Sequence, residues 1–191
     1  MPRQSQPPGQ CKYRWVHRVV ESGLALHSSP PSSSAWRASE LFERPGWSYE
    51  LSDDEITALQ SFAEGEPRPP ELERLAAKLP AELEEGAGAV RIRRLPVGSW
   101  DQPTIEKAFW DLSHQLGTPI SQSAAGEKLF HVRDAGYAPN DPRFRGPMSS
   151  KKLSFHTDRC DVIAFLGIRP AAQGGKTFVV NSQALHEELA R

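Results

Sequence analysis

The stretch LSFHTDRCDVIAFLGIRPAAQGGKT, residues 153–177, holds the features from which the fold and chemistry of this chain can be argued. His156 and Asp158 stand two positions apart in a run that reads as a strand over 153–158. Side chains at i and i+2 of a strand point to the same face, so this spacing predicts that the two side chains can share one cation. An imidazole nitrogen and a carboxylate oxygen form a mixed donor set that suits Fe(II). The triplet therefore indicates a candidate metal site.

The same triplet has a simpler interpretation as well. A His and an Asp exposed at a strand end would bind nothing, and a His-x-Asp triplet arises by chance often enough to be weak evidence alone. The other histidines carry less information still. We interpret His131 as a surface residue or a lid contact, and His114 and His186 as ordinary helix positions. The segments around the triplet must decide between the two interpretations.

Those segments follow a definite order. A phenylalanine precedes the triplet, an apolar strand follows it, and a Gly-Gly-x-Thr turn opens a further strand and helix, in residues 161–163, 166–169, 172–177 and 179–186. Together with upstream segments 34–37, 47–55 and 117–122, they closely resemble the TauD/TfdA-like (taurine dioxygenase-like) family of Fe(II)/2-oxoglutarate-dependent dioxygenases. The resemblance covers roughly residues 35–191 and is specific in a way that the triplet is not.

This resemblance implies roles for individual residues. His156 and Asp158 would be iron ligands, and the hydroxyl of Thr177 would hydrogen-bond 2-oxoglutarate. Gly174 and Gly175 allow a tight turn with positive φ, which would bring Thr177 back beside the metal strand. The implied protein is an oxidoreductase with Fe(II) as cofactor and 2-oxoglutarate as cosubstrate. It would hydroxylate a small organic substrate, with loss of CO2 and formation of succinate.

The resemblance also implies a fold, which is α+β. N-terminal helices would be followed by part of a double-stranded β-helix (jelly-roll, clavaminate synthase-like) core. The third iron ligand of the family is a His far downstream, with an Arg beyond it that binds the distal carboxylate of 2-oxoglutarate, and the chain reaches Arg191 without either. We therefore expect a C-terminally truncated, incomplete core that binds iron and 2-oxoglutarate poorly on its own and is marginally stable. The alternatives are a non-catalytic fragment or pseudoenzyme and, more weakly, a metal-dependent hydrolase.

Local patterns predict the elements along the chain. Ser52 and Glu55 form a capping box that begins a helix over about 53–64. A second helix begins at Glu71, and Pro80 is expected to break or kink it, because proline removes a backbone donor. The remaining predictions are strands at 89–95, 129–133, 153–158, 162–168 and 177–180, a helix over 104–116, and a last helix from about Ser182.

The rest of the sequence bounds the class of protein. Residues 1–34 read as an irregular tail, in which the part from Tyr13 to Leu26 could add one strand, and residues 35–191 form the predicted domain. A net charge of −1 with scattered basic residues argues against nucleic acid, and no apolar run approaches a membrane span. The family resemblance implies a small molecule as the partner. The only two cysteines, Cys11 and Cys160, lie far apart and form no C-x-x-C pair, which favours a reducing, cytoplasmic location. A transit peptide within residues 1–39 is the alternative, and its five prolines oppose it. Nothing in the sequence indicates an oligomeric state.

Overall fold

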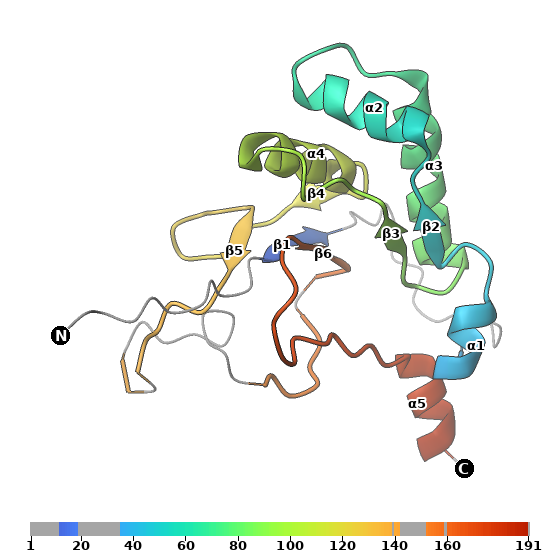
Figure 1. The fold of residues 1–191 in the computed structure, drawn as a ribbon. Helices are drawn as coiled ribbons and strands as arrows, with labels where there is room; N and C mark the ends of the chain where they lie inside the picture. The colour runs from blue at the N-terminus through green and yellow to red at the C-terminus, as the bar shows by residue number, and fades with distance from the viewer. Residues whose placement is uncertain (1–11, 19–34, 139, 142–151, 159, 191) are drawn as a thin grey trace. The chain divides into compact units, whose positions relative to one another are not determined.

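The computed structural model describes residues 12–18, 35–138, 140–141, 152–158 and 160–190 (Figure 1). Helices and short strands are both present, as the predicted α+β class requires. The chain divides into two compact units. One consists of Met1–Val19 and Gly117–Lys176, and the other of Val20–Leu116 and Thr177–Arg191. The described part of the chain contains no helix long and apolar enough to cross a membrane.

The first unit is built on an antiparallel sheet. Its strands are β1 (Lys12–Arg18), β4 (Thr118–Pro119), β5 (Phe130–Val132) and β6 (Val162–Gly167). All three neighbours pair with β1: β6 over residues 12–17, β5 over residues 12–14 and β4 over residues 17–18. The strand allowed for within the N-terminal tail is thus observed as β1. The predictions of strands near 129–133 and 162–168 are confirmed by β5 and β6.

The strand predicted over 153–158 is wrong. Residues 152–158 have no regular secondary structure, and most of them are exposed. A strand needs a neighbouring strand to satisfy its backbone groups, and no ladder reaches this segment within the described residues. The carbonyl of Ser154 lies instead 2.8 Å from the ring nitrogen Nδ1 of His156. A local contact therefore replaces a ladder bond.

The second unit is mainly helical. Its central helices are α2 (Asp53–Ala63), α3 (Pro70–Glu85) and α4 (Gln102–His114), and the predicted helices over about 53–64 and 104–116 are confirmed. A core cluster is formed by Leu51, by Ala58 and Leu59 of α2, and by Leu72, Leu75 and Leu79 of α3, and Leu112 of α4 packs against it. The strands β2 (Ser48–Glu50) and β3 (Arg91–Arg93) run parallel beside it, so only the middle of the predicted strand 89–95 is paired. Shorter helices are α1 (Ala38–Glu43) and α5 (Ser182–Leu189).

The capping box at Ser52 forms as predicted. The Ser52 hydroxyl accepts from the Glu55 amide at 3.2 Å, and the Ser52 amide donates to the Glu55 carboxylate at 2.8 Å. Two of the amides that would otherwise lack partners at the start of α2 are thereby satisfied. This local signal is readable from sequence alone because both partners lie within one turn.

The predicted break at Pro80 is wrong. Helix α3 continues through Pro80 to Glu85. Proline costs the helix one hydrogen bond, but Leu72, Leu75 and Leu79 on the same helix are each 3% exposed or less. Burial of those side chains holds the backbone helical across the proline, so tertiary packing overrides local propensity here.

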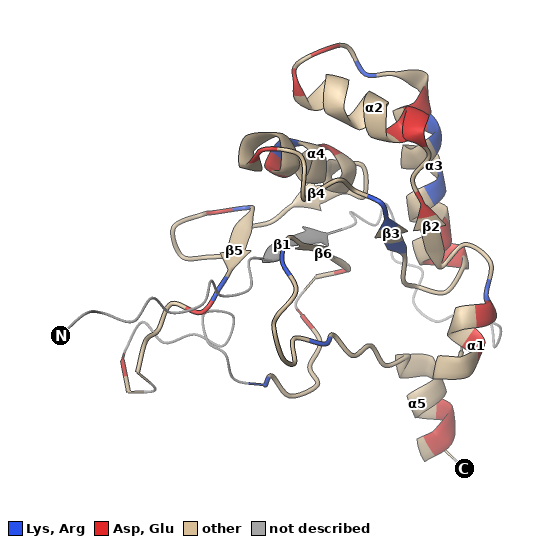
Figure 2. Cartoon of the chain, viewed as in Figure 1, with Lys and Arg blue, Asp and Glu red and all other residues tan. Residues whose placement is uncertain are grey.

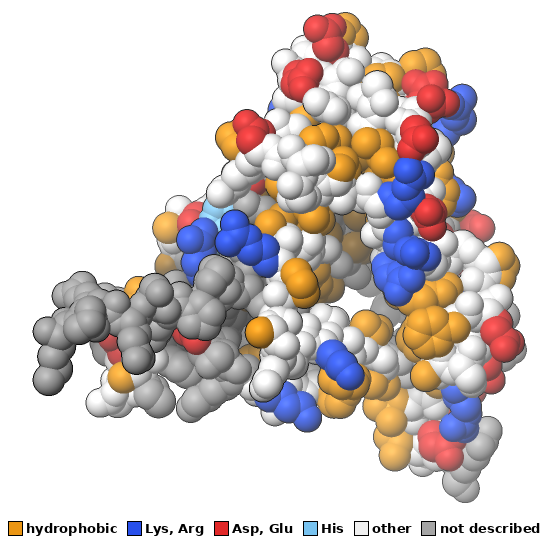
Figure 3. All heavy atoms as spheres, in the orientation of Figure 1, with side chains coloured by type: hydrophobic (Ala, Val, Ile, Leu, Met, Phe, Trp, Pro, Cys, Tyr) orange, Lys and Arg blue, Asp and Glu red, His pale blue; other side chains and the backbone are white. Residues whose placement is uncertain are grey.

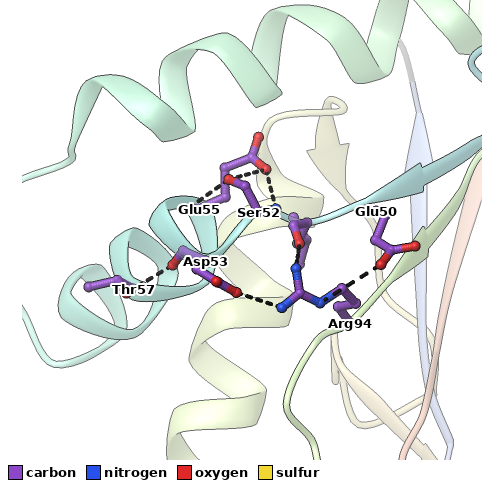
Figure 4. Close-up of polar contacts among 7 residues, drawn as sticks. Glu50, Ser52, Asp53, Glu55, Thr57 and Arg94 are labelled. Atoms are coloured by element: carbon purple, nitrogen blue, oxygen red, sulfur yellow. Dashed lines mark hydrogen bonds and ion pairs between the residues drawn. The ribbon is translucent and has the colours of Figure 1, made fainter.

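Arg94 joins β3 to β2 and α2 (Figure 4). Its guanidinium donates to the carbonyl of Leu51 at 2.8 Å and to the carboxylate of Asp53 at 2.5 Å, and it lies 3.9 Å from Glu50. Its backbone has a φ of 70°, in the left-handed region. Figure 2 shows β3 in blue and acidic residues in red at the start of α2. Arg93 lies 3.6 Å from Glu50 of β2, and Arg94 pairs with Asp53 of α2. The chain therefore leaves β3 at Arg94, and the Arg94 side chain ties this point to β2 and to the start of α2.

The strand predicted over 177–180 is also wrong. Residues 177–180 do not form a strand, and Phe178, Val179 and Val180 are each more than half exposed. Apolar side chains remain visible on the surface in Figure 3. The following helix, α5, confirms the prediction of a helix from Ser182, with Asn181 accepting from the Ala184 amide at 2.8 Å. The segment has strand-forming residues but no neighbouring strand within the described residues.

Candidate metal site

The described pair of predicted ligands lies in the irregular segment before β6. The nitrogen Nε2 of His156 is 4.0 Å from the oxygen Oδ2 of Asp158. The His156 side chain is 53% exposed, whereas that of Asp158 is only 23% exposed. The structure therefore brings together two of the three predicted site residues, without the strand that was expected to do so.

The contact between His156 and Ser154 fixes the chemistry of the ring. A carbonyl oxygen can only accept, so the 2.8 Å contact requires that Nδ1 of His156 carries a proton and donates. In the neutral ring, the free electron pair then lies on Nε2, the nitrogen that faces Asp158. Metal-binding histidines use this same arrangement, in which the second ring nitrogen donates to a carbonyl or carboxylate. In its neutral form His156 would thus present Nε2 to a metal, and in its protonated form the same ring would pair with Asp158.

The distance between the two donor atoms is longer than a bound cation requires. Imidazole nitrogen and carboxylate oxygen each bind a first-row divalent ion such as zinc at about 2.0–2.2 Å, so donors in adjacent positions of an octahedron lie about 3 Å apart. The 4.0 Å separation would therefore have to shorten by about 1 Å on binding. The residues present fit a divalent metal in donor type.

A third protein donor is not found beside this pair. No group of three or more His, Cys, Asp or Glu side chains within the described ranges is placed to hold a metal ion. Two protein donors bind an ion less tightly than three, and they leave more positions to water or to a small chelating molecule. The described part of the site is an open one.

Thr177 belongs to the other compact unit, with α5. The Gly-Gly turn before it has the predicted geometry, since Gly174 and Gly175 have φ values of 74° and 66°. Thr177 itself is exposed. Its contact with 2-oxoglutarate stays a prediction.

The remaining candidates occupy different positions. His114 lies in the last turn of α4 with its ring 6.0 Å from that of Trp110, and His186 lies on α5. His131 lies on β5, opposite Tyr13 of β1. In the loop before the ligand segment, Tyr137 is half-buried, whereas Arg143 and Arg145 lie outside the described residues.

Two features beside the pair could not have been found from side-chain patterns. The carbonyl of Ser154 holds the His156 ring, and a backbone carbonyl leaves no mark in a sequence. A hollow of about 340 Å³ opens along residues 152–155, immediately before His156. Because one continuous segment lines it, the hollow follows from the path of that segment.

Comparison with known proteins decides the family. Residues 55–191 match the model of the family described as taurine catabolism dioxygenase TauD, TfdA family. This match includes His156, Asp158 and Thr177 and covers most of the chain. The chain belongs to the TauD/TfdA family. Members of this family are dioxygenases that depend on Fe(II) and 2-oxoglutarate.

A curated relative supports the same assignment. FR-33289 synthase from Streptomyces rubellomurinus (strain ATCC 31215) is 23% identical to this TauD/TfdA family chain. The alignment covers 82% of the chain and 50% of the relative. The chain thus spans about half the length of the curated relative it matches.

Proposed function

We propose that this chain contributes His156 and Asp158 as iron ligands in a dioxygenase that uses 2-oxoglutarate and hydroxylates a small organic substrate. The observation that carries the proposal is the orientation of the His156 ring. Its Nδ1 is occupied by Ser154, and its Nε2 faces Asp158 at 4.0 Å, inside the region matched by the TauD/TfdA family.

Each residue of the proposed site would have a separate role. Nε2 of His156 and Oδ2 of Asp158 would hold Fe(II), and the Ser154 carbonyl would keep the ring oriented while the ion binds. The Thr177 hydroxyl would donate to a carboxylate of 2-oxoglutarate. The bound iron would supply dioxygen activation, coupled to decarboxylation of 2-oxoglutarate to succinate and CO2. The sequence contains no code for the substrate beyond its expected small size.

The proposal includes a jelly-roll core, of which β6 would be one strand. Large apolar side chains of this region, Leu153, Phe155 and Phe165, are each more than half exposed. Such surface is uncommon on a stable domain unless something covers it. With two described protein donors, we expect weak iron binding and slow turnover by the 191-residue chain. A cytoplasmic location is part of the proposal, since the only two cysteines, Cys11 and Cys160, lie far apart and form no C-x-x-C pair.

A non-catalytic role is the second candidate. It is favoured by the open site, in which no third donor joins His156 and Asp158 within the described ranges. This candidate predicts no iron-dependent chemistry and no effect of substitution at either residue.

The test is the release of CO2 from carboxyl-labelled 2-oxoglutarate by the purified chain with Fe(II) and a reductant. We expect a slow rate above that of iron alone. His156→Ala and Asp158→Ala should each lower the rate of CO2 release to that of iron alone, because each removes one of two described donors. His186→Ala is the matched control, since His186 lies on α5, and it should leave the rate unchanged.

The outcomes separate the two candidates. Iron-dependent CO2 release that falls with both substitutions supports the dioxygenase. A rate equal to that of iron alone, in the unsubstituted chain and in both variants, supports the non-catalytic role and contradicts the dioxygenase proposal.

A further inference from the structure

Strand β1 has a position in its sheet that the family match does not account for. It lies upstream of residues 55–191, the range matched by the TauD/TfdA model. Yet β4, β5 and β6 all pair with it. Lys12 pairs with both Val132 of β5 and Gly167 of β6, so these two strands lie along opposite edges of β1. Each of the three ladders of this sheet therefore has β1 as one of its strands.

The longest of these ladders ends next to the segment that carries the candidate ligands. It runs from Lys12 opposite Gly167 to His17 opposite Val162. Val162 is the first residue of β6, and Asp158 lies only a few positions before it. Because residues 152–158 have no strand pairing of their own, β6 is the paired element nearest to the ligands on their C-terminal side. The ladder with β1 therefore fixes one end of the ligand segment.

A strand held in this way can act as a separate binding element within the same chain. Addition of a strand to a sheet depends mainly on main-chain hydrogen bonds, and a strand tethered to its own sheet has a local concentration in about the millimolar range. We propose that β1 assembles this sheet in cis and thereby positions His156 and Asp158, so that its release weakens the metal site. The second half of this proposal rests on the proposed function.

The variant that tests it removes backbone donors from β1. Trp15 and Val16 lie opposite Ala164 and Ile163 of β6, and successive pairs in an antiparallel ladder alternate between bonded and non-bonded positions. Replacing both residues by proline therefore removes the N–H that donates to β6, whichever of the two carries it. Trp15→Phe with Val16→Thr is the matched control, because it keeps both N–H groups and strand-favouring side chains.

Two measurements on the full chain follow the change. Hydrogen–deuterium exchange reports protection of β6, and calorimetric titration with Co²⁺ reports the metal site. For the double-proline variant we expect exchange of β6 amides to be faster by roughly tenfold or more and Co²⁺ affinity to fall roughly tenfold. Amides of α2 and α3, in the other unit, should keep their protection and show that the variant is folded. The Phe/Thr control should match the unsubstituted chain.

A peptide copying residues 10–20 keeps the test decisive if the variant also loses protection in α2 and α3. Added to the double-proline variant, it should restore protection of β6, and a peptide with the same two prolines should not. Unchanged β6 exchange in the variant would overturn the proposal. Faster β6 exchange with unchanged Co²⁺ affinity would overturn the claim that β1 positions His156 and Asp158. Failure of the unsubstituted chain to bind Co²⁺ would overturn the proposed function instead, and β6 exchange would then decide the role of β1 in the sheet alone.

Discussion

Glu55 joins Tyr49 and Ser52 in a cluster of polar contacts in the helical unit. Its carboxylate accepts from the Tyr49 hydroxyl at 2.5 Å, from the Ser52 amide at 2.8 Å and from the Ser52 hydroxyl at 3.0 Å. Burial raises the pKa of the Glu55 carboxyl, but the hydrogen bonds from Tyr49 and Ser52 and the charge of Lys78 outweigh burial and lower it below its ordinary value. Glu55 is therefore a charged group held by a complete set of partners.

Tyr49 makes this contact sensitive to high pH. Its hydrogen bond to Glu55, followed by burial and the Glu55 charge, raises the pKa of the phenol from 10.0 to about 12. The folded chain keeps this proton in a range where the unfolded chain has lost it. The resulting stability is fully present below pH 10 and is lost as the pH rises toward about 12.

We expect Tyr49→Phe to lower the free energy of unfolding by about 1.5 kcal/mol at neutral pH, because it removes a hydrogen bond to a charged group. The variant should also lose less stability than the unsubstituted chain between pH 10 and pH 12. Urea unfolding at a series of pH values measures both effects. Parallel stability curves for the two proteins across that range would show that Tyr49 does not couple to Glu55.

Gly46 and Gly65 form a natural pair for testing close packing. Both have positive φ, 91° and 103°, so alanine is strained at each. Only at Gly46 would the added Cβ meet another group, the carboxylate of Glu82, which accepts from the Ala87 amide at 3.2 Å. At Gly65 nothing lies within 4 Å.

Gly46→Ala should therefore destabilise the chain by about 1 kcal/mol more than Gly65→Ala, the value of one displaced hydrogen bond. Urea unfolding of both variants gives the difference. In a Glu82→Ala background the two substitutions should cost the same. A difference that persists there would mean that Glu82 is not what limits the space at Gly46.

At the scale of elements, helix α3 contains a proline that local propensity disfavours, and the packing of the helix tolerates it. Pro80 lies inside the helix and is only half-buried, while Leu75 and Leu79 beside it are buried. Alanine at this position would restore the missing backbone bond and remove the clash of the ring with the preceding turn.

We expect Pro80→Ala to raise the free energy of unfolding by about 1–3 kcal/mol, within the difference in helix propensity between the two residues. Chemical denaturation measures the change. Glu84→Ala, an exposed substitution in the same helix, is the control and should change stability by less than about 0.5 kcal/mol. A Pro80→Ala variant that is less stable than the unsubstituted chain would mean that the proline ring contributes packing that outweighs the helix bond.

The elements that the sequence predicted correctly share a physical property. Helices α2 and α4 are set by partners within one turn, such as Ser52 with Glu55 and Asp101 with Thr104. Strands need a neighbour that can lie anywhere in the chain, and the runs at 153–158 and 177–180 have suitable residues without a ladder. Strand β1 does form, and its three neighbouring strands come from residues a hundred or more positions further along the chain. Local patterns predicted where helices form, but not which strands pair.

At the scale of the whole molecule, the family could be predicted from the order of short motifs, and the TauD/TfdA match shows it. The roles of His156 and Asp158 as iron ligands stay a prediction. The way the two residues are held could not be predicted, because spacing placed them on a strand and the structure places them in an irregular segment. The contact that orients His156 comes from a carbonyl of the backbone. Side-chain patterns report which residues are present, whereas the tautomer of a ring depends on where the backbone runs.

The central claim is that Nε2 of His156, with Asp158, binds a divalent cation while Nδ1 stays bonded to Ser154. It is tested by NMR spectroscopy of the histidine ring nitrogens of the ¹⁵N-labelled chain during titration with Zn²⁺. We predict that the Nε2 resonance of His156 moves on metal binding, that Nδ1 remains protonated, and that Asp158→Ala weakens the response roughly tenfold or more. A His156 ring that is unchanged at saturating Zn²⁺, or one that binds the ion through Nδ1, would contradict the account.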